Sequence, residues 1–91
     1  MATKLLTNGD TELVSPANGS QFTLEELQEH VGGYIQLIHT PGGRLLVIDE
    51  EGKLKNKPIN ERATGILRSC GPVTGDCIVG DALWVKNNEI D

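Results

Sequence analysis

The chain has few of the residues on which most enzymes and metalloproteins depend. Its 91 residues include two cysteines, two histidines and one each of Phe, Tyr and Trp. Cys70 and Cys77 lack the spacing of a zinc or redox motif, so we expect two reduced thiols. His30 and His39 have no serine or cysteine that the sequence would place beside them. These shortages predict a non-enzymatic protein with no catalytic residues, no metal site and no cofactor.

The sequence also lacks long apolar runs and an excess of positive charge. No apolar run approaches the roughly 20 residues of a membrane span, and no basic and apolar leader starts the chain. We therefore expect a cytoplasmic protein with no membrane partner. The net charge is −5, whereas general nucleic-acid binders carry a basic face. We expect no nucleic-acid partner.

Length and apolar content predict a single domain over residues 1–91, with a modest core. Hydrophobic residues make up 37% of the chain. A monomer of this size buries little apolar surface, and association of identical chains would bury more. We therefore expect a homo-oligomer.

Two β-hairpins are predicted from turn residues between β-prone runs. Asn8, Gly9 and Asp10 separate residues 3–7 from residues 11–15, and Asn-Gly supplies the positive φ angles of a tight turn. Pro41, Gly42 and Gly43 separate residues 34–40 from residues 44–49. Residues 45–48 are all apolar, which is typical of a strand buried on both faces.

The first predicted helix has well-defined ends. Thr23 and Glu26 have the spacing of a capping box, and Phe22 and Leu27 that of a hydrophobic staple. Gly32 can adopt the left-handed conformation that commonly ends helices. The apolar stripe of this helix is expected to comprise Leu24, Leu27 and Val31.

A second helix is predicted over residues 61–68. Asn60 can cap its start, with Ile59 as a staple residue. Its core-facing side is expected to comprise Ala63, Leu67 and Cys70, with Ile66 beside them.

A final strand over residues 77–85 carries Trp84, and about the last six residues are expected to fray. The predicted order is therefore β-β-α-β-β-α-β. This is an α+β fold in which a mostly antiparallel sheet of about five strands carries two short helices on one face.

Several of these segments form one ordered pattern: LEELQEHVGGYIQ at 24–36, VIDEEGKLKNKPINERAT at 47–64 and IVGDAL at 78–83. The chain resembles a family of small phage- and plasmid-borne proteins catalogued only as a domain of unknown function. Its pattern is a short hairpin, then LQxxVGGYI, EEGK, NxxAT and IVGD. The likeness spans nearly the whole chain, although the stretch 70–76 is longer than expected. It implies a mobile-element accessory protein of the bacterial cytoplasm and brings no catalytic residues.

Several residues are suited to a phosphorylated ligand. A helix N-terminus at Asn60 can seat a phosphate, arginines can neutralise it, and aromatic rings can stack on a base. Paired glycines allow close approach to the backbone. Each residue also has a structural alternative as a cap, a surface charge, a helix stop or a core residue. The candidate ligand-binding residues are Asn60, Arg62, Thr64, Tyr34, Gly32, Gly33, Trp84 and Arg44.

Three functions are compatible with these features. The preferred one is counter-defence, in which the protein sequesters a small nucleotide-type immune signal in a pocket between protomers. The alternative is an acidic, DNA-mimicking inhibitor of a host enzyme. The third is a hydrolase with a metal on Asp49 and Glu50. The acidic residues available to a mimic are Glu25, Glu26, Glu29, Asp49, Glu50 and Glu51.

Overall fold

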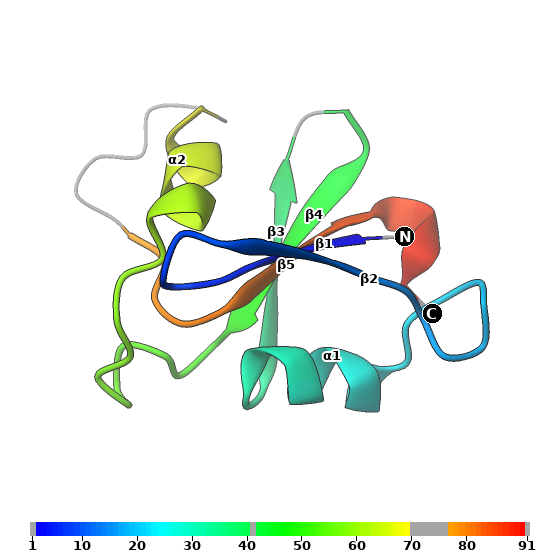
Figure 1. Ribbon diagram of the computed structural model, residues 1–91, viewed down its shortest axis with the longest axis horizontal. Coiled ribbons are helices and arrows are strands. Elements are labelled where there is room, and N and C mark those ends of the chain that lie inside the picture. The colour runs from blue at the N-terminus through cyan, green and yellow to red at the C-terminus, as the bar shows by residue number, and fades with distance from the viewer. Residues whose placement is uncertain (1, 41, 70–76, 91) are drawn as a thin grey trace.

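The computed structural model describes residues 2–40, 42–69 and 77–90, and it confirms the predicted order of elements. Neither of its two α-helices is long and apolar enough to cross a membrane. The elements, shown in Figure 1, are β1 (Ala2–Leu5), β2 (Thr11–Val14), α1 (Leu24–Val31), β3 (Ile35–Thr40), β4 (Arg44–Asp49), α2 (Glu61–Ser69), β5 (Ala82–Lys86) and the 3-10 helix η1 (Asn87–Glu89).

All five strands form one antiparallel sheet in the order β2-β1-β5-β4-β3. The last strand, β5, therefore lies at the centre and joins the two hairpins. β2 and β3 are the edges. The α+β fold with a five-stranded sheet is confirmed, and its sheet is complete only once the C-terminal strand is in place.

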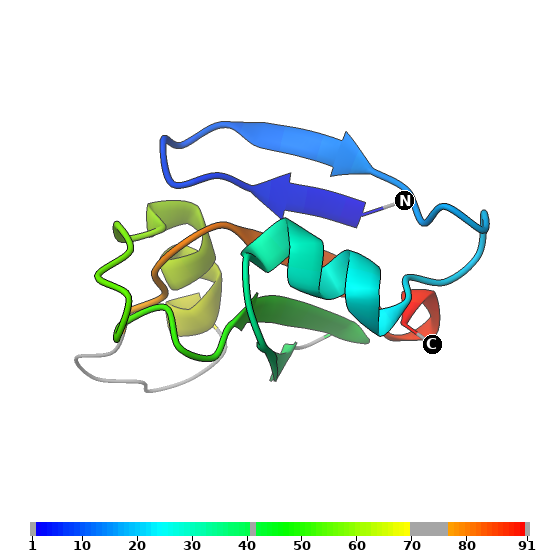
Figure 2. The ribbon, with the colours of Figure 1, turned by 90° about the horizontal axis from the view of Figure 1, so that it is seen from below.

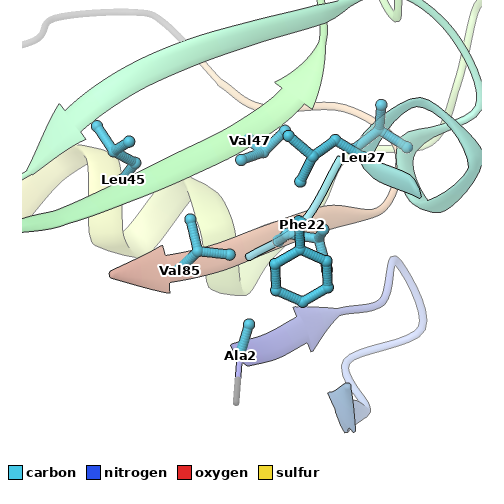
Figure 3. Close-up of a cluster of buried hydrophobic side chains, with 8 residues drawn as sticks. Ala2, Phe22, Leu27, Leu45, Val47 and Val85 are labelled. Atoms are coloured by element: carbon cyan, nitrogen blue, oxygen red, sulfur yellow. The ribbon is translucent and has the colours of Figure 1, made fainter. Parts of the chain in front are cut away.

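The two helices cover opposite faces of the sheet, so the prediction that both cover one face is wrong. Leu45 and Val47 belong to the buried cluster under α1, which Figure 3 shows converging on Phe22 and Leu27. Leu46 points the other way, into the cluster under α2. Because neighbouring strand residues point to opposite faces, a strand that is apolar at successive positions needs cover on both sides. The buried run in β4 was predicted correctly, and this consequence of it was missed.

The ends of α1 are as predicted. The Glu26 amide donates to Thr23 Oγ1 at 3.2 Å, and the Thr23 amide donates to Glu26 Oε1 at 3.1 Å, which completes the capping box. Gly32 has φ 85° and closes the helix. Leu24, expected in the apolar stripe, is 57% exposed. Phe22 precedes the cap, is fully buried, and supplies the apolar side chain at this end of the helix.

α2 is capped by Asn60, whose Oδ1 accepts from the Ala63 amide at 3.1 Å. Ala63 and Leu67 are buried, as predicted. Ile59 is 54% exposed and bridges Val79, so it does not act as a staple. The predictions for Cys70 and for the stretch 70–76 lie outside the described residues.

The C-terminal region differs in detail from the predicted strand. β5 begins at Ala82, because residues 78–80 bond to the segment before α2 instead of extending the sheet. Near the chain end, where fraying was expected, the Phe22 amide donates to Glu89 O at 2.6 Å and Ile90 bridges Phe22. Figure 2 shows η1 beside the start of α1.

Candidate ligand-binding site

A groove lies between α2 and the β1–β2 hairpin, with a volume of about 420 Å³. The sheet register sets its floor, since Thr3 of β1 lies directly opposite Trp84 of β5. Half-buried Ile66 of α2 also packs against the core on this side. The groove is lined by Thr3, Leu5, Thr11, Arg62, Gly65, Ile66 and Trp84.

Trp84 supplies a flat aromatic surface and carries an unusual buried donor. The Arg44 guanidinium lies over its ring, 4.5 Å from the ring centroid. Such a cation–π contact contributes about 0.5–2 kcal/mol. The indole Nε1 is buried and has no hydrogen-bond partner among residues 2–40, 42–69 and 77–90. A desolvated donor without an acceptor costs about 1–3 kcal/mol.

Arg62 stands at the rim of the groove. Its Nε donates to the carbonyl of Gly9 in the β1–β2 turn, which ties the helix to the hairpin. Its terminal guanidinium nitrogens make no hydrogen bond or ion pair within the described part of the chain. They remain available to an anion.

Gly65 keeps the groove wide at mid-helix. A Cβ placed on Gly65 would meet no atom within 4 Å. Glycine in a helix interior is less favourable than alanine by about 1 kcal/mol, and no packing constraint requires it here. The absent side chain leaves room between the helix and Trp84.

Asn60 and Thr64, predicted to contact phosphate, are instead bonded to backbone. Asn60 is fully buried, and its Nδ2 donates to Leu5 O at 2.8 Å and Gly80 O at 3.0 Å. Thr64 Oγ1 accepts from the Ile78 amide at 2.9 Å. Both side chains lie beneath α2 and hold it against the segment before β5.

Gly32 and Gly33 make room for lysine side chains. Lys57 Nζ donates to Val31 O at 2.8 Å, and Lys55 Nζ donates to Gly32 O at 3.2 Å. A Cβ on Gly33 would collide with Lys55 Nζ. These cations satisfy carbonyls at the negative end of the α1 dipole.

Tyr34 lies apart from the Trp84 groove. It is 66% exposed and borders a separate hollow of about 220 Å³ with Gly33 and Lys55. Of the predicted ligand residues, the structure therefore gathers Arg62 and Trp84 in one groove with Arg44 stacked on the tryptophan. It does not bring Tyr34, Gly32 or Gly33 to them.

The segments of the sequence pattern meet at a junction beyond the C-terminus of α1. Gly80 donates its amide to Pro58 O at 2.8 Å, and a Cβ on Gly80 would come within 2.8 Å of Lys57 Cδ. Asn60 and Lys57 thus connect the ends of α1 and α2 to the IVGD segment.

A family model described as domain of unknown function (DUF3846) matches residues 5–91. The chain belongs to the DUF3846 family. No curated protein and no solved structure matches it. The matched range contains every segment of the junction. Within it, Lys57, Asn60 and Thr64 bond to backbone atoms.

At the centre of this DUF3846 junction lies Asp49, which is 4% exposed. Its Oδ2 lies 2.6 Å from Lys57 Nζ and 3.0 Å from Lys55 Nζ, and its Oδ1 accepts from the Glu51 amide. Burial alone would raise the pKa of this carboxyl, but the hydrogen bonds from Lys57, the Glu51 amide and Lys55 outweigh it and lower the pKa to about 2.

The two lysines were missed from the sequence, although the dipole of a helix ending at Gly32 favours cations nearby. Asp49 is buried and paired with these two partly exposed lysines, while Glu50 is exposed, so the two carboxylates do not form a metal-binding pair. The described ranges contain no group of three His, Cys, Asp or Glu residues that could hold a metal ion.

Proposed function

We propose that this protein is a non-enzymatic accessory protein of a phage or other mobile element, and that it acts in counter-defence. In the host cytoplasm it binds and sequesters a small nucleotide-type immune signal. The observation that carries the proposal is the Trp84 groove, which Arg62 lines together with the Trp84 ring, while Arg44 stacks on that ring.

The chemistry of the groove suits a nucleotide. Indole offers a surface on which a base can stack, and guanidinium groups pair with phosphate oxygens. The volume of about 420 Å³ falls within the range typical of small-molecule sites. None of the described residues that line the groove is acidic, so a phosphate bound there would meet no carboxylate among them, although the chain has a net charge of −5.

The groove also favours binding over turnover. Among the residues that the structure describes, its lining contains no Asp, Glu, His, Cys or Lys, which are the usual general acids, bases and nucleophiles. A ligand held there would meet the Arg62 guanidinium, the Trp84 ring, threonine hydroxyls and apolar surface. Sequestration needs nothing more.

The alternative, an acidic inhibitor that imitates DNA, has less support. Asp49 is neutralised by two lysines, and Glu26 is engaged in the capping box and with the Ala17 amide. Glu25, Glu29 and Glu50 remain exposed. A mimic would bind its target more weakly as salt rises, whereas the groove depends on a small ligand.

Native mass spectrometry of the protein purified from bacteria tests the proposal first, because a retained mass would identify the ligand. Thermal shift with cyclic AMP, cyclic di-AMP, cyclic di-GMP and cyclic ADP-ribose follows. We expect Arg62→Ala and Gly65→Gln, which fills the groove, to abolish the shift. Tyr34→Ala, at the other hollow, should keep it. Absence of any ligand mass and of any shift would overturn the proposal, as would turnover of a bound nucleotide.

A further inference from the structure

The two edges of the sheet differ in how well they are protected from pairing. Edge strands expose backbone donors and acceptors, and proteins usually block them with charges, prolines or short length. β2 has four residues and contains Glu12. β3 has six residues, IQLIHT, with no proline and no Asp, Glu, Lys or Arg. β3 is the unprotected edge.

The alternation of hydrogen bonds between β3 and β4 identifies which backbone groups of β3 point away from the sheet. The Glu50 amide donates to Tyr34 O at 2.8 Å, so Tyr34 bonds toward β4. In an antiparallel pair, successive residues alternate between bonding to the partner strand and pointing away from it. Ile35, Leu37 and His39 therefore direct their N–H and C=O groups to the open edge.

We propose that two copies of this chain pair antiparallel through β3, with a two-fold axis at Leu37. The outward residues lie two positions on either side of Leu37, so the pattern is complementary to itself. Leu37 would pair with the partner's Leu37, and Ile35 with the partner's His39. Each of these would be a doubly hydrogen-bonded pair. The two sheets would become one.

The side chains of β3 are compatible with a second copy. Leu37 is 40% exposed and would meet its equivalent on the α1 face. Ile35 already packs against the core, so pairing would extend that core across the interface. On the other face, Gln36 would lie opposite the partner's Ile38. A second copy is the favoured partner because it brings the same uncharged strand, so that no like charges face each other, and an apolar Leu37 to cover the exposed Leu37 at the two-fold axis.

Sedimentation equilibrium over a wide concentration range tests the pairing with two matched variants. Leu37→Lys places like charges face to face at the two-fold axis, and Leu13→Lys makes the same change on the β2 edge, where Leu13 is 73% exposed. We expect the wild type and Leu13→Lys to be dimers and Leu37→Lys to be a monomer with an unchanged circular dichroism spectrum. A monomeric wild type at every concentration would overturn the proposal, as would a dimer that Leu13→Lys alone disrupts.

Amide hydrogen exchange by NMR locates the interface. The Ile35 and His39 amides should exchange slowly in the wild-type dimer, where they donate to the partner strand. In Leu37→Lys they should exchange at least about tenfold faster, because the monomer leaves them open to water. Gln36 and Ile38, bonded to β4, should stay protected in both and report intact folding. Rapid exchange at Ile35 and His39 in a wild-type dimer would place the interface elsewhere and refute the pairing. The measurement needs no ligand, so it is independent of the groove.

Discussion

The two faces of the sheet differ in how their helices are capped and packed. Under α1, eight buried residues of the described chain form one cluster, the helix is capped at both ends, and two lysines bond to the carbonyls at its C-terminus. Under α2, a second buried cluster packs on the sheet, and within the described residues the buried indole N–H of Trp84 has no partner beside the groove. The α1 face is closed by packing, whereas the α2 face carries the groove for which we propose a ligand. Substitutions on the two faces should therefore change the free energy of unfolding by different amounts, and in one case with the opposite sign.

The largest effect is expected from Phe22→Ala under α1. Phe22 is fully buried, so its removal should lower the free energy of unfolding by about 3–5 kcal/mol. Ile66→Ala on the α2 side removes a half-buried side chain and should cost about 1–2 kcal/mol. Urea denaturation of both variants checks the difference. Equal losses would show that the two faces contribute alike.

Asp49→Asn should be next in size. It leaves two lysines without their carboxylate, and because these are 40% and 23% exposed the loss should be about 2 kcal/mol rather than that of a fully buried pair. Glu50→Gln is the control, because Glu50 is the exposed residue next to Asp49. It should change the free energy of unfolding by less than about 0.5 kcal/mol.

The same pair gives a pH test. The pKa of Asp49 falls from 3.8 to about 2 on folding, so its contribution is complete above pH 3.8 and is lost as the pH falls through about 2. The stability gap between wild type and Asp49→Asn should therefore narrow over this interval. A gap that stays constant with pH would contradict the assigned ion pairs.

Gly80→Ala should destabilise the junction by about 1–2 kcal/mol. Gly80 has φ 79°, a left-handed conformation that disfavours a side chain, and the added Cβ would press on Lys57. Thermal denaturation measures the loss. A neutral result would mean that the IVGD glycine is not required for the contact with Lys57.

The smallest effect, of opposite sign, is expected from Gly65→Ala. The added methyl group meets no atom within 4 Å, and alanine favours the helix by about 1 kcal/mol. The variant should melt at a higher temperature than the wild type, and it should bind the proposed nucleotide ligand more weakly than Tyr34→Ala does. Lower stability would indicate that Gly65 is needed for the fold.

Much of the fold could be predicted because its signals are local. Thr23 with Glu26, Gly9 in the β1–β2 turn, and Asn60 before α2 each act through hydrogen bonds or φ angles within a few residues. The turn is longer than predicted, since it spans residues 6–10, and Asn8 accepts from the Asp10 amide instead of adopting a positive φ. The candidate site was harder. Arg62 and Trp84 were selected for their chemistry, but nothing local indicates that Thr3 of β1 lies opposite Trp84 of β5. Asn60 and Thr64 were selected as phosphate ligands, and their backbone partners lie far away in the chain.

By itself, the sequence determined which segments become helices and strands, where α1 begins and ends, and that β4 is buried on both faces. These depend on turn chemistry, caps and the alternation of apolar residues. Only the tertiary structure decided that β5 enters the centre of the sheet, that the helices take opposite faces, and that Asp49 binds Lys55 and Lys57. Those features rest on contacts between distant segments, whose pairing no local pattern specifies.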